Sequence, residues 1–204
     1  MLISRFILPL IGASFAAGTA MAGSCVSSAN MGQGILAEYA DGTLTEVRRA
    51  DDGLVEVTEL AVEEIGGDMR YTAKWGLYDL AVEALKDGKA SPDHRVDYRY
   101  DGDPLPQPQP GGLPWVGTVA ATFPGDEVST EQAAYVFGAE ARVELDGCSY
   151  RSFPINVTFT QGYEWESQTF LYFPDLGFAM LIENSGMMNI KERQELVRLT
   201  AKAG

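Results

Sequence analysis

The sequence is poor in the residues that most catalytic and metal sites require. It has one histidine, His94, and two cysteines in 204 residues. A Ser-His-Asp triad passes its proton through an imidazole, and the chain has no G-x-S-x-G motif to present a nucleophilic serine. Two cysteines and one histidine also give no recognisable zinc-ligand spacing. We therefore expect no catalytic histidine, no metal site and no cofactor.

Basic residues are scarce as well. Lysine and arginine together number 15 against 29 aspartates and glutamates, which gives a formal net charge of −14 at pH 7. A nucleic-acid-binding surface needs clustered Lys and Arg to displace counterions from phosphates, so we expect no nucleic-acid partner. The acids are spread along the chain without a block of five or six, which argues against a dedicated acidic tail.

Long apolar runs are confined to the N-terminus. Met1–Ala22 combines the single charge of Arg5, an apolar stretch over 6–17 and the small-residue pattern of Ala20-Met21-Ala22. This pattern is typical of a cleaved secretory signal peptide, and its apolar run is shorter than the about 20 residues that cross a membrane. We expect cleavage near Ala22, a mature chain without a transmembrane segment, and a location in the periplasm or outside the cell.

The two cysteines, Cys25 and Cys148, are the only ones in the chain. An exported protein meets an oxidising environment, so we predict a disulfide between them. No basic neighbour in the sequence would lower the pKa of either thiol, which argues against a catalytic cysteine. The bridge would enclose more than half of the chain and tie down the mature N-terminus.

The sequence also lacks long helical periodicity and a Gly-rich phosphate loop, which excludes a parallel α/β fold. What it has instead is short alternating runs, such as Leu54–Val62, separated by turn dipeptides. These dipeptides are Asp41-Gly42, Asp52-Gly53, Gly66-Gly67, Asp87-Gly88, Asp146-Gly147 and Gln161-Gly162. The pattern predicts a mainly β fold, an antiparallel meander forming a sandwich or half-barrel, with at most one or two short helices. Residues 77–85 and 190–201 fit a helix or a strand, and 135–145 is expected to be one strand.

Residues 101–114 contain five prolines and separate two β segments. Proline removes amide donors and favours extended chain, so this stretch is expected to be a connection and not a central strand. Each segment alone is small for an independent core. We therefore expect a single β-rich domain over residues 23–204.

One hairpin resembles a known group of proteins. Tyr172-Phe173-Pro174-Asp175-Leu176-Gly177 has the form Y-x-P-x-L-G and is followed by the aliphatic run 179–183. It is similar to hairpins in uncharacterised exported and periplasmic antiparallel β-domain proteins of Gram-negative bacteria, which are related in style to lipoprotein-carrier half-barrels. The resemblance implies a fold style and a location, and it carries no catalytic residue across. Pro174 presets φ for a turn, and Gly177 can adopt positive φ.

Two kinds of functional residue remain. Glu164 and Glu166 would share one face of a strand, and such a carboxylate pair is what a glycosidase uses. Trp165, Tyr172 and Phe178 belong to an aromatic cluster that would form either sheet core or an apolar groove. We expect an exported, non-enzymatic β-domain that binds an envelope partner or a small apolar ligand. The alternative is a periplasmic carboxylate-based, glycosidase-like hydrolase.

The excess of acidic residues generates the first prediction. Loss of the leader removes only Arg5 among charged residues, so the mature chain is one unit more negative than the full chain. At about 50 mM salt, where screening is weak, it should flow through a heparin column and fail to sediment with anionic vesicles. Retention on either would contradict the charge argument and reveal a local basic patch.

Overall fold

The computed structural model describes residues 25–63, 66–102, 104–187 and 192–202. The expected leader Met1–Ala22 lies outside these residues. Within them the only helical element is η1, a 3-10 turn at Ser28–Asn30. The strands are β1 Ile35–Tyr39, β2 Leu44–Arg49, β3 Val55–Val62, β4 Gly67–Lys74, β5 Tyr78–Lys86, β6 Lys89–Tyr100, β7 Trp115–Thr122, β8 Val128–Phe137, β9 Ala141–Leu145, β10 Cys148–Gln161, β11 Glu164–Phe173, β12 Phe178–Gly186, β13 Glu192–Arg193 and β14 Leu196–Ala201.

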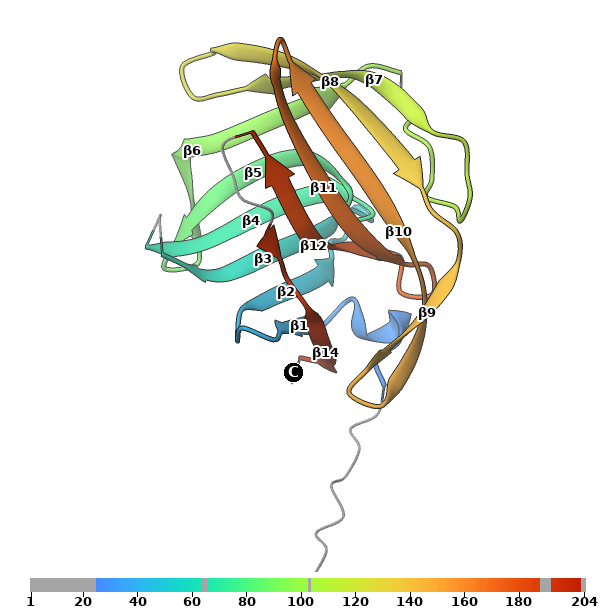
Figure 1. Ribbon diagram of the computed structural model, residues 1–204. Coiled ribbons are helices and arrows are strands. Elements are labelled where there is room, and N and C mark those ends of the chain that lie inside the picture. Colours follow the sequence, from blue (N-terminus) through green and yellow to red (C-terminus); the bar gives the residue numbers. More distant parts are fainter. Residues whose placement is uncertain (1–24, 64–65, 103, 188–191, 203–204) are drawn as a thin grey trace, which may run out of the picture.

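The strands form one antiparallel sheet in the order β13-β12-β11-β10-β8-β7-β6-β5-β4-β3-β2-β1-β14, with β9 paired to β10. Most neighbours in this order are also neighbours in sequence, as expected for a meander. The predicted mainly β, antiparallel fold is therefore confirmed (Figure 1). Residues 77–85 lie mainly in β5, and the C-terminal stretch carries β13 and β14, so both ambiguous segments are strands where the structure describes them.

The turn dipeptides take the backbone conformations that tight hairpins need. Asp87 and Gly88 have φ values of 54° and 71°, and they join β5 to β6 as a two-residue loop. Asp146 and Gly147 have φ values of 47° and 79° and join β9 to β10 in the same way. Two successive positive φ values match the right-handed twist of the paired strands. Gly177 in the Y-x-P-x-L-G turn also has a positive φ, of 78°, as expected.

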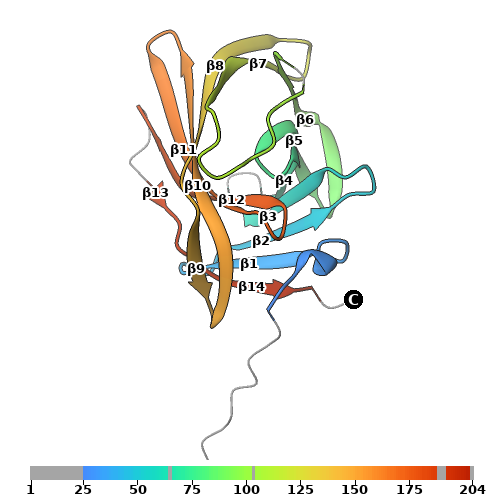
Figure 2. The same ribbon diagram turned by 90° about the vertical axis from the view of Figure 1, so that its right-hand side faces the viewer.

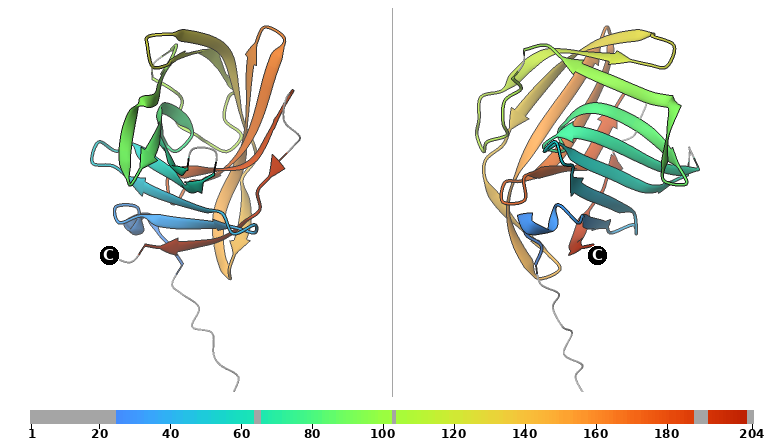
Figure 3. Two further views of the ribbon diagram at one scale, coloured as in Figure 1. Left: turned by 90° about the vertical axis from the view of Figure 1, so that its left-hand side faces the viewer. Right: turned by 180° about the vertical axis from the view of Figure 1, so that it is seen from behind.

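The C-terminal segment, which contains β13 and β14, joins the two edges of the sheet. β13 pairs with β12, and the amide of Gln194 donates to the carbonyl of Ile182 at 2.9 Å. One residue later the carbonyl of Glu195 accepts from the amide of Ala40 at 2.8 Å, and β14 then pairs with β1. The sheet is thereby rolled, and β3–β5 face β11–β12 across its interior (Figures 2 and 3).

The expectation of one strand over 135–145 is wrong. The segment is divided between β8 and β9, which pair with different halves of β10. The break falls at Gly138, whose amide donates to the carbonyl of Pro154 at 2.8 Å. A Cβ added to Gly138 would lie 2.6 Å from Pro154 Cγ, so only glycine permits this close crossing.

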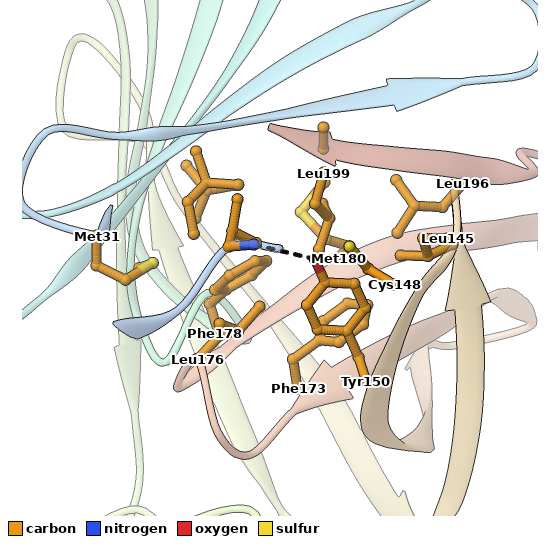
Figure 4. Close-up of a cluster of buried hydrophobic side chains, with 14 of the residues drawn as sticks. Met31, Leu145, Cys148, Tyr150, Phe173, Leu176, Phe178, Met180, Leu196 and Leu199 are labelled. Carbon is orange, nitrogen blue, oxygen red and sulfur yellow. Dashed lines mark hydrogen bonds between the residues drawn. The ribbon is translucent and has the colours of Figure 1, made fainter. Parts of the chain in front are cut away.

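Two hydrophobic clusters fill part of the interior. The first lies near the N-terminus and β14, and it is packed around Phe173, Phe178 and Tyr150 (Figure 4). The second surrounds Tyr78 and Tyr135, whose ring centroids are 4.6 Å apart. The proline-rich connection 101–114 contributes Leu105 to this second cluster, and the Tyr78 hydroxyl donates to the Pro106 carbonyl at 3.2 Å. Because the connection packs against strands of both β segments, it is part of the same core.

The predicted disulfide between Cys25 and Cys148 is present. It fastens the N-terminal segment to the start of β10, next to the first cluster. There the amide of Val26 donates to the Tyr150 hydroxyl at 3.2 Å, an interaction drawn in Figure 4. Met31 is 1% exposed in the same cluster, so the N-terminal segment covers this end of the roll.

Removal of this disulfide should destabilise the fold substantially. A bridge across a sequence separation of 123 residues restricts the unfolded chain strongly. The Cys25→Ser/Cys148→Ser variant should therefore lose about 2–5 kcal/mol of unfolding free energy in a urea titration. Reductant should lower the stability of the wild type to that of the variant and leave the variant unchanged. Equal stability of the variant and the oxidised wild type would contradict a structural role for the bridge.

Candidate functional site

One cavity has a volume of about 390 Å³ and lies inside the roll, and it is called the main cavity below. One wall is formed by β3, β4 and β5, and the other by β11, β12 and β13 with Gln194. The turn between β4 and β5 reaches across to the opposite wall, where the carbonyl of Trp75 accepts from the amide of Ala179 at 2.9 Å. Gly76 lines the cavity at this point, and a Cβ there would lie 3.0 Å from the Ala179 carbonyl oxygen. The two walls are thus held together at the floor of this main cavity.

The main cavity continues into two smaller hollows. A second cavity of about 130 Å³ shares Asp79, Glu166 and Gln168 with the main cavity. A third, of about 200 Å³, shares Glu131 and Glu166 with the second. Because they share lining residues, the three hollows are neighbours inside the roll.

The lining of these hollows is acidic on one part and apolar on another. Val57, Phe170 and Leu181 supply apolar surface to the main cavity. The acidic residues of the three linings are Glu59, Asp79, Glu131, Glu164, Glu166, Glu183 and Glu192. Among the described lining residues there is no lysine, arginine or histidine. The charged side chains among these lining residues are therefore all negative.

Asp79 is the most unusual member of the lining. It lies between the main and second cavities, and its carboxylate has no hydrogen bond or ion pair with any described residue. Burial, reinforced by the neighbouring carboxylate of Glu59, raises the pKa of Asp79 to about 7. Close to neutral pH this side chain is therefore divided between its charged and neutral forms.

The pKa values of other acidic groups and tyrosines around Asp79 are raised as well. Burial raises the pKa of Glu59, although the Tyr71 hydroxyl donates a hydrogen bond to its Oε2 at 3.1 Å. Burial and the Glu166 carboxylate raise the pKa of Glu131. Burial, followed by the charges of Asp79, Glu131 and Glu166, raises the pKa of Tyr98 to about 12. Carboxylates on β3, β5, β8 and β11 therefore raise the pKa of a neighbouring acidic group or tyrosine.

A second buried acid on β5 shows what the fold does with a structural carboxylate. Glu83 is 5% exposed, and its Oε1 accepts from Arg70 Nε at 3.0 Å and from Arg70 Nη2 at 2.6 Å. Its Oε2 lies 3.6 Å from Arg95 Nη1. Two arginines thus compensate Glu83, whereas Asp79, four residues earlier on the same strand, has no basic partner among the described residues.

The structure separates the residues that the sequence suggested. Glu164, Trp165 and Glu166 all line the third cavity, and Trp165 is 44% exposed. Tyr172 and Phe178 are 3% and 0% exposed and lie in the second and first hydrophobic clusters. His94 is exposed on β6, where its Nδ1 lies 3.1 Å from Ser91 Oγ. Of the aromatic candidates, Trp165 therefore borders the third cavity and the other two are core residues.

The sequence analysis did not identify Asp79, Glu59 or Tyr71. Asp79 faces inward because β5 carries one extra residue, Leu80, opposite the Thr72–Ala73 step of β4. This bulge places Asp79 and Ala81 on opposite faces of the sheet and breaks the simple alternation. The available signal was weak: the Trp75-Gly76 turn marks where β5 begins, and no sequence pattern marks a bulge two residues further on.

Two further features bear on the chemistry. In the described part of the chain, no group of three or more His, Cys, Asp or Glu side chains is placed to hold a metal ion. Among the same residues, no helix has the length and hydrophobicity to cross a membrane. The cavity carboxylates are thus distributed around a space and do not converge on a point.

The unpartnered carboxylate generates a stability prediction. In the folded chain Asp79 holds its proton up to about pH 7, whereas an unfolded aspartate loses it near pH 3.9. The unfolded state therefore binds fewer protons between these values, and wild-type stability falls as pH rises from about 4 to 7. The groups facing Asp79 from the packed strands are Glu59, Tyr71, Tyr98, Tyr100, Tyr135 and Glu166.

Asp79→Asn should accordingly stabilise the protein at about pH 8, by up to about 4 kcal/mol, and leave it unchanged at about pH 4. Urea titrations at both pH values measure this difference. Asp93→Asn, which alters an exposed acid of β6, is the matched control and should show no such dependence. A destabilising Asp79→Asn change at high pH would show that the carboxylate is compensated in solution.

Comparison with known proteins assigns no family: no family model matches the chain, and neither a curated protein nor a solved structure does. The resemblance of the Y-x-P-x-L-G hairpin to periplasmic β-domains therefore stays an expectation. The interior cavity and its charge are the observations from which a function has to be inferred.

Proposed function

We propose that the protein is an exported, non-enzymatic β-domain that binds a small ligand in the main cavity. The observation that carries this proposal is the cavity itself, which has a volume of about 390 Å³ and lies between the two walls of the roll. Small-molecule sites typically range from about 300 to 1,000 Å³ and combine apolar surface with a few polar groups. The main cavity has both properties.

The lining indicates a ligand with an apolar portion. Val57, Phe170 and Leu181 come from both walls and provide a surface for such a portion. The Tyr39 hydroxyl donates to the Leu181 carbonyl at 3.0 Å and so fixes one side of this surface from β1. These contacts support the expected small ligand better than an envelope partner, because they lie inside the roll, where a folded protein does not enter.

The disulfide supports the proposed location. Cys25 and Cys148 form a disulfide. Disulfides persist in oxidising compartments and are rare in the cytosol. Together with the signal-like pattern of Met1–Ala22, this favours cleavage near Ala22 and a mature protein in the periplasm or outside the cell.

The hydrolase alternative has less geometric support. Glu164 and Glu166 do lie together at the third cavity, as the sequence suggested. They alternate with Trp165 on one strand, however, so both carboxylates project from the same face, with backbones about 7 Å apart. A glycosidase needs its acid and its base or nucleophile on either side of the scissile bond. Two side chains from one strand face do not provide that arrangement.

Binding of a neutral fluorescent probe, N-phenyl-1-naphthylamine, tests the proposal. It should bind with saturable fluorescence enhancement at one site per chain. Gln168 lines the main cavity from the middle of β11, so Gln168→Trp should fill the space and weaken probe binding at least about tenfold.

Thr169→Trp is the matched control, because Thr169 is the next residue on β11 and its Oγ1 donates to Asn156 Oδ1 at 3.1 Å, on the other face. This variant should bind the probe as the wild type does. Equal binding by wild type and Gln168→Trp would place the probe outside the main cavity and contradict the proposal.

A further inference from the structure

We infer that the ligand of the main cavity is a small organic cation, an amine or quaternary ammonium group attached to an apolar or aromatic body. The inference rests on the proposed function and specifies its ligand class. It depends on three observations: the sign of the charge inside the roll, the presence of acceptors without donors, and the aromatic and apolar surfaces beside them.

The sign of the charge excludes anionic ligands. Glu59 and Asp79 come from one wall of the main cavity, and Glu166 and Glu192 come from the other. With no basic residue among the described lining, an anion would meet carboxylates on both sides. A neutral ligand would leave the Asp79 carboxylate without a compensating charge among the described residues. A cation lowers the free energy of the occupied state by compensating it.

Two of the hydrogen-bond acceptors that line the cavity lack a donor among the described residues. The Asp79 carboxylate has no partner among the described residues. Asn184 Oδ1, on the facing wall, is buried and also has no hydrogen-bond partner. The amide donor of the Gln168 side chain is used by Glu166 Oε1, at 2.8 Å. A buried acceptor without a partner is costly, and a protonated amine brings up to three N–H donors.

Aromatic faces border the same acids. Tyr71 and Phe170 line the main cavity from opposite walls, and Tyr98 lines the second cavity beside Asp79. The face of an aromatic ring attracts a cation, and the attraction increases where water is excluded. Aromatic rings next to carboxylates are therefore suited to a cationic nitrogen with carbon attached.

An organic cation fits this space better than a metal ion. In the described residues the acids do not form a group that would coordinate one ion. Val57 and Leu181 would contribute no ligand to a metal, but they would pack against the body of an organic molecule. The cavity volume of about 390 Å³ is also far larger than a coordination sphere requires.

Calorimetric titration with tryptamine and tryptophol tests the inference. Both molecules have the same indole body. Tryptamine carries a protonated amine where tryptophol carries a neutral hydroxyl. At about pH 8, where Asp79 is ionised, tryptamine should bind at least about tenfold more tightly than tryptophol. Indole-3-propionate, which carries a carboxylate instead, should not bind.

Asp79→Asn should reduce the preference for tryptamine over tryptophol to about twofold or less, because it removes the unpartnered charge. Asp93→Asn, with the same loss of charge at an exposed site, should keep the full preference. An unchanged preference in Asp79→Asn, or equal affinity for the two ligands in the wild type, would overturn the inference. If N-phenyl-1-naphthylamine still binds in the main cavity in that case, the proposed binding function stands and only the cationic ligand class fails.

Discussion

The pairing of the C-terminal segment with both edges of the sheet is the constraint on which the interior depends. Residues 192–194 are bonded to β12, and residues 195–201 to β1, so a change of partner within two residues turns a long meander into a roll. Without that change, β3–β5 and β11–β12 would lie far apart in one open sheet. The main cavity lies between these two walls. The disulfide and the first hydrophobic cluster occupy the end of the roll nearest β14.

The interior is divided by polarity as well as by space. Apolar side chains fill the clusters around Phe173 and Tyr78, whereas the remaining volume is lined by acids that face one another. The two acids of β5, Glu83 and Asp79, differ in whether an arginine compensates them. Arg70 and Arg95 compensate Glu83 of β5, whereas Asp79 of the same strand has no partner in the described part of the chain. Uncompensated charge destabilises a folded chain, and such sites are commonly those used for binding.

Much of the fold was predictable, and the candidate site mostly was not. Asp-Gly pairs such as Asp87-Gly88 marked hairpins because few residue types adopt positive φ values. The alternating run Leu54–Val62 marked a strand, which the structure shows as β3. The division of 135–145 depends on the contact of Gly138 with Pro154, which is distant in sequence. The inward orientation of Asp79 depends on a bulge, and its position opposite Glu166 depends on the closing of the roll. Strand alternation is enough to predict that Glu164 and Glu166 are neighbours, but their position relative to the opposite wall depends on residues distant in sequence.

The central claim is that the cavity holds an uncompensated carboxylate which a cation compensates. The most direct measurement is the pH titration of the Asp79 side-chain carbon by NMR, with and without saturating tryptamine. In the free protein the pKa should be near 7, and tryptamine should lower it by at least about one unit, because a bound cation favours the charged form. A pKa close to the ordinary value of about 4 in the free protein, or one that tryptamine leaves unchanged, would contradict the account.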